Sequence, residues 1–354
     1  MNIFLDKYFS LIKRLVPEKD SRSLVGIDVG LQNCKMVELK KNGQTFELLR
    51  WTIEPILQSD PSGAIKSALA KLSTPTNSPR TAIFGKGTLI RYIDMPRMSL
   101  EDLRKSFALE ADKYFPFPHD QIYTDCYILD TKAKDNKMSV LVAAAKKDLI
   151  DGRIELLTSL GLQTDFISLN PIAIANVANV LPIQPSDIEE PVDDTKKAYA
   201  ILDMGEMVSN VTVMMEGLPR FTRDIFIGGK EFTRSISNAM AVSLEEAEEI
   251  KCQPKDRLSM ILNACDSTIL NLVSELRLSF DYFTTERNVP LSHLFLTGGA
   301  SRLEGMAGIF SRYLEVAVKR WDIFSAVQMS DQMREELKPD ASQLMVALGL
   351  ALYQ

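Results

Sequence analysis

The stretch that decides the fold reads Val25-Gly26-Ile27-Asp28-Val29-Gly30-Leu31-Gln32-Asn33-Cys34-Lys35-Met36-Val37-Glu38-Leu39. An apolar run leads into an Asp-x-Gly sequence, a polar turn follows, and a second run alternates in polarity, which predicts a β-hairpin. We expect the glycine to give the tip a positive φ and to let a ligand approach the backbone. Amides exposed at such a tip bind anions, and the neighbouring carboxylate suits a hydrated Mg²⁺. Taken alone, the stretch is also typical of an ordinary hairpin.

A second hairpin of the same design lies in the second half of the chain. It reads Ala200-Ile201-Leu202-Asp203-Met204-Gly205 and continues through Ser209 to Val211-Thr212-Val213. Two such tips that faced each other would hold a polyphosphate from both sides.

A third signature follows near residue 300. An apolar strand ends in a glycine pair, in the sequence Leu294-Phe295-Leu296-Thr297-Gly298-Gly299-Ala300-Ser301, and a helical stretch begins after Gly305. Glycines at a junction of strand and helix allow a flat ring system to lie against bare backbone.

The three signatures, in this order, resemble the actin, Hsp70 and hexokinase superfamily of ATP-binding proteins. The segment Ala247-Glu248-Glu249-Ile250-Lys251 is similar to the one with which bacterial actins contact adenosine. The resemblance implies an α/β fold of two lobes, each ribonuclease H-like, as in actin.

A more specific resemblance lies in Ala108-Leu109-Glu110-Ala111-Asp112-Lys113-Tyr114-Phe115-Pro116-Phe117-Pro118. This stretch resembles the PilM family, which comprises cytoplasmic actin-like proteins of type IV pilus assembly related to the cell-division protein FtsA. The resemblance covers residues 24–354 and implies a small inserted α+β subdomain, called 1C, in place of a subdomain of actin. From the residues alone, the prolines stop a helix and hold two aromatics beside an extended segment. Phe115 and Phe117 either pack the helix end, which the residues alone favour, or line a groove for a partner peptide, which the family resemblance suggests.

Changes in composition divide the chain into seven parts. We expect an amphipathic helix (1–17), a first lobe (22–80), the inserted subdomain (81–169), a helix connecting the lobes (170–181), an acidic proline-rich loop (182–197), a second lobe (198–340, with a helix-rich part called 2B at about 230–288) and a closing helix that returns to the first lobe (341–354).

The N-terminal helix has two contrasting faces. Aromatic and aliphatic residues gather on one side of residues 1–16, and polar and basic residues gather on the other. Such a helix packs on its own domain, on a partner subunit or on a membrane surface. Only three cations face one acid, so any electrostatic attraction to a membrane is modest.

Carrying the superfamily site onto this chain, residue by residue, implies a site for ATP and Mg²⁺. Asp28 and Asp203 would hold the metal. The other contacts to the nucleotide would come from Gly30, Leu31, Gln32, Asn33, Lys35, Gly205, Ser209, Gly228, Gly229, Glu248, Lys251, Gly298, Gly299 and Ser301. The chain departs from the family after the second Asp-x-Gly, where Glu206-Met207-Val208 stand in place of small or hydroxyl residues. An acid and two bulky side chains weaken the case for phosphate contact there, and no residue is marked as positioning an attacking water. The chain is therefore at most a weak ATPase.

Composition narrows the function classes. The formal net charge of −6 does not favour nucleic acid as a partner. Four scattered cysteines and two histidines do not form a zinc or disulfide framework, and no apolar run is long enough to span a membrane. We expect a cytoplasmic protein, peripheral to the inner membrane.

Three function classes remain, and the PilM resemblance orders them. The first is an ATP-binding scaffold of type IV pilus or related secretion assembly that docks the cytoplasmic tail of a PilN-like inner-membrane protein, with other pilus components as further partners. The second is an FtsA-like, filament-forming membrane tether. The third is a small-molecule kinase of the hexokinase or acetate kinase type, although no substrate pocket with a general base is marked.

Overall fold

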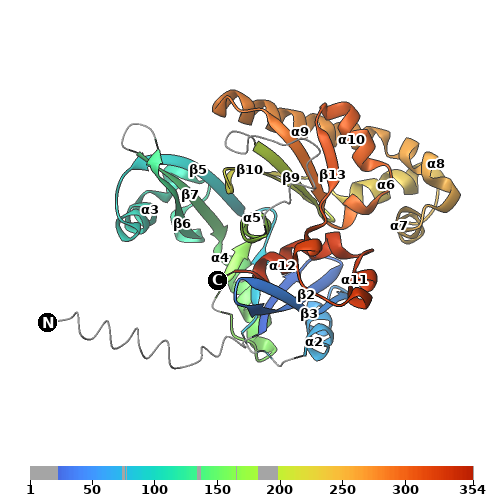
Figure 1. Cartoon of the computed structure of the whole chain (residues 1–354), viewed down its shortest axis with the longest axis horizontal. Helices are drawn as coiled ribbons and strands as arrows, with labels where there is room; N and C mark the ends of the chain where they lie inside the picture. Colours follow the sequence, from blue (N-terminus) through green and yellow to red (C-terminus); the bar gives the residue numbers. More distant parts are fainter. Residues whose placement is uncertain are drawn as a thin grey trace.

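The computed structural model describes residues 23–73, 76, 78–133, 137–164, 166–181 and 198–353. The expected helix at 1–17 and the expected loop at 182–197 lie outside the described residues. Two lobes, each built on one sheet, face each other, and a smaller unit projects beside the second lobe (Figure 1).

The two large sheets have the same topology. The first runs β3-β2-β1-β4-β8 and the second β11-β10-β9-β12-β13, each with three antiparallel strands followed by two parallel ones. The first sheet comprises β1 (Ser23–Val29), β2 (Asn33–Asn42), β3 (Thr45–Pro55), β4 (Arg80–Ile83) and β8 (Ile167–Leu169). The second comprises β9 (Ala198–Met204), β10 (Ser209–Met215), β11 (Leu218–Ile225), β12 (Leu291–Thr297) and β13 (Ala317–Arg320). This duplication is the architecture predicted for the two-lobed actin-like fold.

Helices cover both faces of the first sheet. On one face α2 (Pro61–Ala70) and α4 (Lys147–Ser159) form an apolar core with β1 and β2. On the other face α5 (Asn170–Val180) and α12 (Met345–Ala351) build the core that reaches the second lobe. These two helices lie within the ranges where the connecting helix (170–181) and the closing helix (341–354) are expected.

Small residues let α12 approach its neighbours closely. A Cβ on Gly349 would lie 1.9 Å from the Ala173 carbonyl oxygen of α5, and one on Gly26 would lie 2.0 Å from the Ala347 carbonyl oxygen. The close approach of α12 to α5 therefore depends on Gly349, and its close approach to β1 depends on Gly26.

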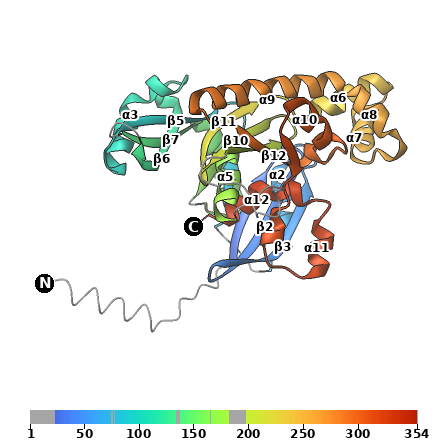
Figure 2. The same ribbon diagram turned by 45° about the horizontal axis from the view of Figure 1, so that its top comes forward.

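The second lobe carries five helices and two short 3₁₀ turns. They are α6 (Gly229–Met240), α7 (Leu244–Cys252), η4 (Lys255–Arg257), α8 (Leu258–Ala264), α9 (Asp266–Arg287), η5 (Gly299–Arg302) and α10 (Met306–Leu314). The long α9 runs along the outside of this lobe (Figure 2), and buried side chains such as Leu272 and Leu276 face the sheet. Helices α6 to α9 correspond to the helix-rich part predicted at about 230–288.

The inserted subdomain is a three-stranded sheet with one helix. Its strands β5 (Thr88–Pro96), β6 (Ile122–Ala133) and β7 (Lys137–Lys146) are ordered β5-β7-β6, α3 (Leu100–Tyr114) packs on one face, and η1 (His119–Gln121) precedes β6. Ser99 caps α3 by accepting a hydrogen bond of 3.1 Å from the Asp102 amide. The Tyr92 hydroxyl of β5 shares a hydrogen bond of 2.8 Å with the Thr222 hydroxyl of β11, so the subdomain contacts the second lobe.

Two predicted boundaries need correction. The insertion was placed at 81–169, but β4 and β8 pair within the first sheet and α4 packs on it, so the subdomain spans about the strands from Thr88 to Lys146. The second lobe was extended to residue 340, but the chain returns to the first lobe directly after β13. The Gln328 amide donates to the Phe46 carbonyl, and the Gln328 carbonyl accepts from the Leu48 amide, both at 2.8 Å, which joins this segment to β3. Residues of three further elements pack in the core next to the first sheet: η6 (Ile323–Ala326), α11 (Asp331–Leu337) and η7 (Ala341–Leu344).

Within the described part of the chain, no helix is long and apolar enough to cross a membrane.

Candidate functional site

A cavity of about 1030 Å³ opens between the two lobes. Both hairpin tips line it, together with the glycine pair, the start of α6, the end of α7 and the segment at 338–343. Of the residues expected to bind nucleotide, those that line it are Asp28, Gly30, Leu31, Gln32, Asn33, Lys35, Asp203, Gly205, Gly229, Glu248, Lys251, Gly298 and Gly299. The structure therefore brings together in one place most of the residues that the motifs singled out.

The two hairpin tips close in the same way. The Gly30 amide donates to the Asn33 carbonyl at 3.0 Å, and the Gly205 amide donates to the Val208 carbonyl at 3.1 Å. A Cβ would lie 3.0 Å from the acceptor oxygen in the first turn and 2.8 Å from it in the second. Neither glycine has a positive φ, so the expectation of a positive φ at the tips is wrong, and glycine is needed for lack of space.

The turn also uses one amide that was expected to meet phosphate. The Gly30 N–H donates its hydrogen bond within the hairpin, whereas the N–H groups of Leu31 and Gln32 have no backbone acceptor among the residues described. The amides of this tip that are available to an anion are therefore those of Leu31 and Gln32.

Two carboxylates, one from each lobe, stand beside Lys35. Its Nζ lies 2.9 Å from Asp28 Oδ2, across the register that pairs β1 with β2. Burial alone would lower the pKa of Lys35, but the charge and hydrogen bond of Asp28, with Asp203 nearby, raise it above its ordinary value. Burial raises the pKa of Asp203 to about 7, Lys35 opposes that rise, and Asp28 adds to it.

The donor set fits a hydrated Mg²⁺ and does not fit an all-protein metal cage. No group of three or more candidate metal ligands occurs among the described residues. Asp28 and Asp203 offer two carboxylates at the hairpins, which matches a Mg²⁺ that keeps its waters and takes further oxygens from phosphates. One carboxylate is already paired with Lys35.

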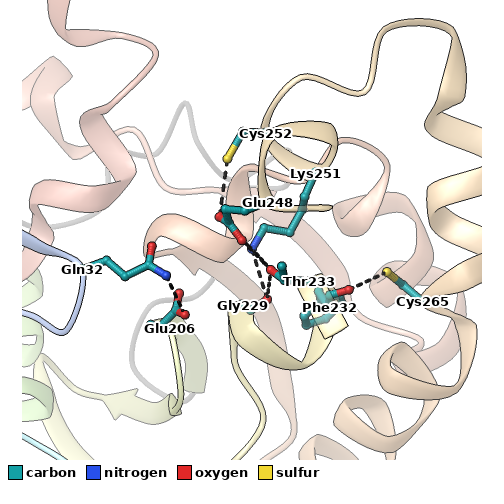
Figure 3. A network of polar contacts seen from close by, with 9 residues as sticks. All are labelled: Gln32, Glu206, Gly229, Phe232, Thr233, Glu248, Lys251, Cys252 and Cys265. Atoms are coloured by element: carbon teal, nitrogen blue, oxygen red, sulfur yellow. Dashed lines mark hydrogen bonds and ion pairs between the residues drawn. The ribbon is translucent and has the colours of Figure 1, made fainter. Parts of the chain in front are cut away.

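The unexpected acid after the second Asp-x-Gly joins the two tips. Gln32 Nε2 donates to Glu206 Oε1 at 2.8 Å (Figure 3). Burial raises the pKa of Glu206, Lys251 lowers it, and Glu248 raises it. The Glu206 carbonyl accepts from the Lys230 amide at 2.8 Å, so its backbone is fixed on the first turn of α6.

Lys251 is held by the protein itself. Its ammonium donates to Gly229 O at 3.1 Å, to Thr233 Oγ1 at 2.7 Å and to Glu248 Oε2 at 2.5 Å (Figure 3). Three acceptors use all three donors of an ammonium, so Lys251 is held in place by the protein, and its expected contact with ribose or adenine stays a prediction. Burial alone would raise the pKa of Glu248, but Lys251 and Thr233 lower it, so Glu248 is ionised where it lines the cavity.

Three residues expected at the nucleotide lie outside the cavity lining. The buried Ser209 hydroxyl donates to the Ile227 carbonyl at 2.6 Å, and the buried Ser301 hydroxyl donates to the Gly298 carbonyl at 2.7 Å. Gly228 caps α6 and packs against the backbone of Glu206. The two serine side chains and Gly228 therefore fix the conformation of the loops around the cavity. The direct nucleotide contacts expected of these three residues need correction.

The two glycines of the pair have different roles. Gly298 has φ +85, and a Cβ there would lie 2.5 Å from Asp203 Oδ1. At Gly299 the nearest atom to a Cβ would be Gln343 Oε1 at 3.5 Å, an ordinary contact. Gly298 therefore keeps space for Asp203, and Gly299 gives the cavity its open wall.

Sequence reasoning missed several residues of the lining. Arg302 donates to Asp340 at 3.0 Å, and Gln343 donates to the same carboxylate at 2.9 Å, which ties the returning segment to the glycine pair. Asn170, the first residue of α5, places at the cavity a buried Oδ1 that finds no hydrogen-bond partner among the residues described. Only the position of Asn170 at the start of the predicted connecting helix signalled it, and no local motif marks the other residues.

The two aromatics considered for a partner peptide differ in exposure. Phe115 is buried in the core of the inserted subdomain, so it packs the end of the helix. Its expected contact with a partner peptide therefore needs correction. Phe117 is half-buried, with Lys146 Nζ 5.7 Å from its ring centroid. It remains a candidate for contact with a partner.

Comparison with known proteins gives one family and one fold. The family model described as "Type IV pilus assembly protein PilM" matches residues 26–354. The cell division protein FtsA of Bacillus subtilis (strain 168) is 26% identical over 170 residues, which are 44% of this chain and 36% of FtsA. The match thus spans about a third of that relative's length.

Two solved structures share the fold over nearly their whole length. The PilM-PilN type IV pilus biogenesis complex matches with a TM-score of 0.81 at 23% identity, over 95% of this chain and 98% of that one. The ethanolamine utilization protein EutJ from Carboxydothermus hydrogenoformans matches with a TM-score of 0.53 at 15% identity, over 100% of both chains. At such identities the likeness concerns the fold.

Proposed function

This chain belongs to the PilM family of type IV pilus assembly proteins, and on that premise we propose that it binds ATP with Mg²⁺ in the interlobe cavity and docks the cytoplasmic tail of a PilN-like inner-membrane protein. It would then act as an actin-like scaffold at the cytoplasmic face of that membrane. The scaffold would bind ATP as a structural component and would hydrolyse it slowly at most.

The observation that carries the nucleotide proposal is the pair of hairpin tips. They face one cavity, each with a carboxylate behind it and a turn closed by the same bond. The Leu31 and Gln32 amides meet anions, Asp28 and Asp203 hold a hydrated metal through its waters, and Gly299 supports a flat base. Bound Mg²⁺ would supply the positive charge that the phosphates need.

The docking proposal starts from the solved complex, whose printed name pairs PilM with PilN. In this chain the inserted subdomain contributes no phosphate motif, and its sheet has β6 as an edge strand. An extended tail can add to such an edge while pockets take alternate side chains. Phe117, half-buried near the start of this strand, is our candidate anchor.

The test uses a synthetic copy of the N-terminal cytoplasmic tail of the PilN-like protein from the same genome, titrated into the full chain. Phe117→Ala should weaken binding by about 2 kcal/mol or more, as the loss of an aromatic anchor commonly does. Tyr282→Ala is the matched control, because Tyr282 is an exposed aromatic on α9 of the other lobe. Equal affinity in the parent and Phe117→Ala proteins would place the anchor elsewhere, and the N-terminal segment would become the next candidate.

A further inference from the structure

We propose that the Glu206 carboxylate is a built-in competitor of the terminal phosphate, and that it makes the cavity discriminate against nucleoside triphosphate relative to diphosphate. This inference rests on the proposed nucleotide site and concerns which nucleotide that site prefers. Three features of the described residues carry it: the position of Glu206 between the tips, the charges around it, and the fixed backbone that aims it there.

The carboxylate lies between the two hairpin tips that line the proposed nucleotide site. One oxygen accepts the hydrogen bond from Gln32 on the opposite tip. The other lies beside the start of α6, where a Cβ built on Gly229 would be 3.6 Å from Glu206 Oε2. The positive end of the helix dipole attracts negative charge, so the carboxylate already places an acid between the two lobes.

Two ammonium groups of the cavity already face acids of the protein. Lys35 pairs with Asp28, and Lys251 pairs with Glu248 and also donates to Gly229 O and Thr233 Oγ1. An incoming phosphate therefore meets the Glu206 carboxylate while the charges of Lys35 and Lys251 are already partly balanced by other acids. A triphosphate carries one more negative charge into this gap than a diphosphate does, so it suffers the larger penalty.

Backbone hydrogen bonds fix the direction in which the Glu206 side chain leaves the main chain. The Glu206 carbonyl accepts from Lys230 N, and the neighbouring Gly205 carbonyl accepts from Gly229 N, both at 2.8 Å. The side chain itself makes one hydrogen bond, to Gln32. Changing the side chain therefore removes the charge and leaves the turn intact.

The experiment measures the dissociation constants of Mg-ATP and Mg-ADP by calorimetry for the full-length parent, Glu206→Gln and Gln32→Ala proteins. Glu206→Gln removes the charge and keeps a partner for Gln32. It should tighten ATP binding about tenfold, a gain expected from removing one like charge at close range, and tighten ADP binding by a clearly smaller factor. Gln32→Ala, which frees the carboxylate to turn away, should shift the ATP-to-ADP ratio in the same direction but less.

The control is Glu231→Gln. Glu231 lies in the first turn of α6, close enough to influence Glu206, but it does not line the cavity. An unchanged ATP-to-ADP ratio in Glu206→Gln, or an equal change in Glu231→Gln, overturns the inference and leaves nucleotide binding standing. ATP binding that appears only in Glu206→Gln supports the inference. Failure of the folded parent and of both cleft variants to bind either nucleotide at millimolar concentration overturns the nucleotide site, and the inference with it.

Discussion

Gln32 and Glu206 are 174 residues apart in the sequence, yet their side chains share a hydrogen bond of 2.8 Å across the cavity. This bond links the tips of the two hairpins that define the fold. Opening the gap for a phosphate tail must therefore break it or move it. The free state of the cleft is held partly closed by its own side chains.

The first prediction concerns stabilisation by nucleotide. Mg-ATP should raise the melting temperature of the parent protein, because a ligand that binds only the folded state stabilises it by mass action. Asp28→Asn should reduce that shift strongly, since one of the two metal-holding carboxylates is lost. A melting temperature that does not move with millimolar Mg-ATP would contradict the proposed site.

Asn is the substitution of choice because of Lys35. The Asp28 side chain is buried and pairs with the partly exposed Lys35 ammonium, so Asp28→Ala would leave that cation without its hydrogen-bond partner and destabilise the fold. Asn keeps an oxygen acceptor for that ammonium. The melting temperature without nucleotide separates loss of fold from loss of binding.

The second prediction separates the two glycines of the pair. Gly298→Ala combines a φ of +85 with a Cβ 2.5 Å from Asp203 Oδ1, and the backbone strain alone is worth about 1–3 kcal/mol. Gly299→Ala meets only an ordinary contact at 3.5 Å, and we expect a change within about 0.5 kcal/mol. Urea unfolding of both variants measures the difference, and equal losses would show that the crowding at Asp203 is unimportant.

Local pattern was enough to predict most of the elements. The helix expected to stop at the prolines that follow Phe115 and Phe117 is α3, which ends at Tyr114, and the hairpins at 25–39 and 200–213 are β1–β2 and β9–β10. Alternation of polarity, Asp-x-Gly turns and capping residues act within a few positions along the chain, so a single sequence displays them. The motif residues of the cavity were found for the same reason.

Long-range pairing could not be predicted in this way. The strands β4 and β8 complete the first sheet from either side of the insertion, and short parallel strands carry no signal of their partners. The saturation of Lys251 and the bond between Gln32 and Glu206 depend on segments that meet only after folding. The sequence motifs predicted which residue types line the cavity. They did not predict which polar atoms of these residues form hydrogen bonds within the protein.

The third prediction concerns pH. Asp203 has an ordinary pKa of 3.8 and a folded-state pKa of about 7, raised mainly by burial. The folded state then holds this proton more tightly than the unfolded state, so the contribution to stability is complete below about pH 4 and is lost as pH rises through about 7. Asp203→Asn does not titrate, so the free energy of unfolding of the parent minus that of the variant should fall over this window. Urea titrations without nucleotide at several pH values test it, and a difference that stays constant with pH would contradict it.

The last prediction concerns the closing helix, and it compares two helical glycines with opposite surroundings. Ala is ordinarily favoured over Gly inside a helix by about 1 kcal/mol. At Gly308 of α10 a Cβ would meet nothing within 4 Å, so Gly308→Ala should be neutral or stabilising by up to that amount.

At Gly349 of α12 the same change should have the opposite sign. A Cβ there would lie 1.9 Å from the Ala173 carbonyl oxygen and 3.0 Å from Val177 Cγ2. The helix must move away from α5 to admit it, and overpacking of this kind costs about 1–3 kcal/mol or more. Because α12 and α5 share the core that joins the two lobes, Gly349→Ala should also weaken Mg-ATP stabilisation, whereas Gly308→Ala should leave it unchanged. Melting temperatures of both variants with and without Mg-ATP provide the test. A stable Gly349→Ala protein that responds normally to nucleotide would show that the close approach of these helices does not set the geometry of the cleft.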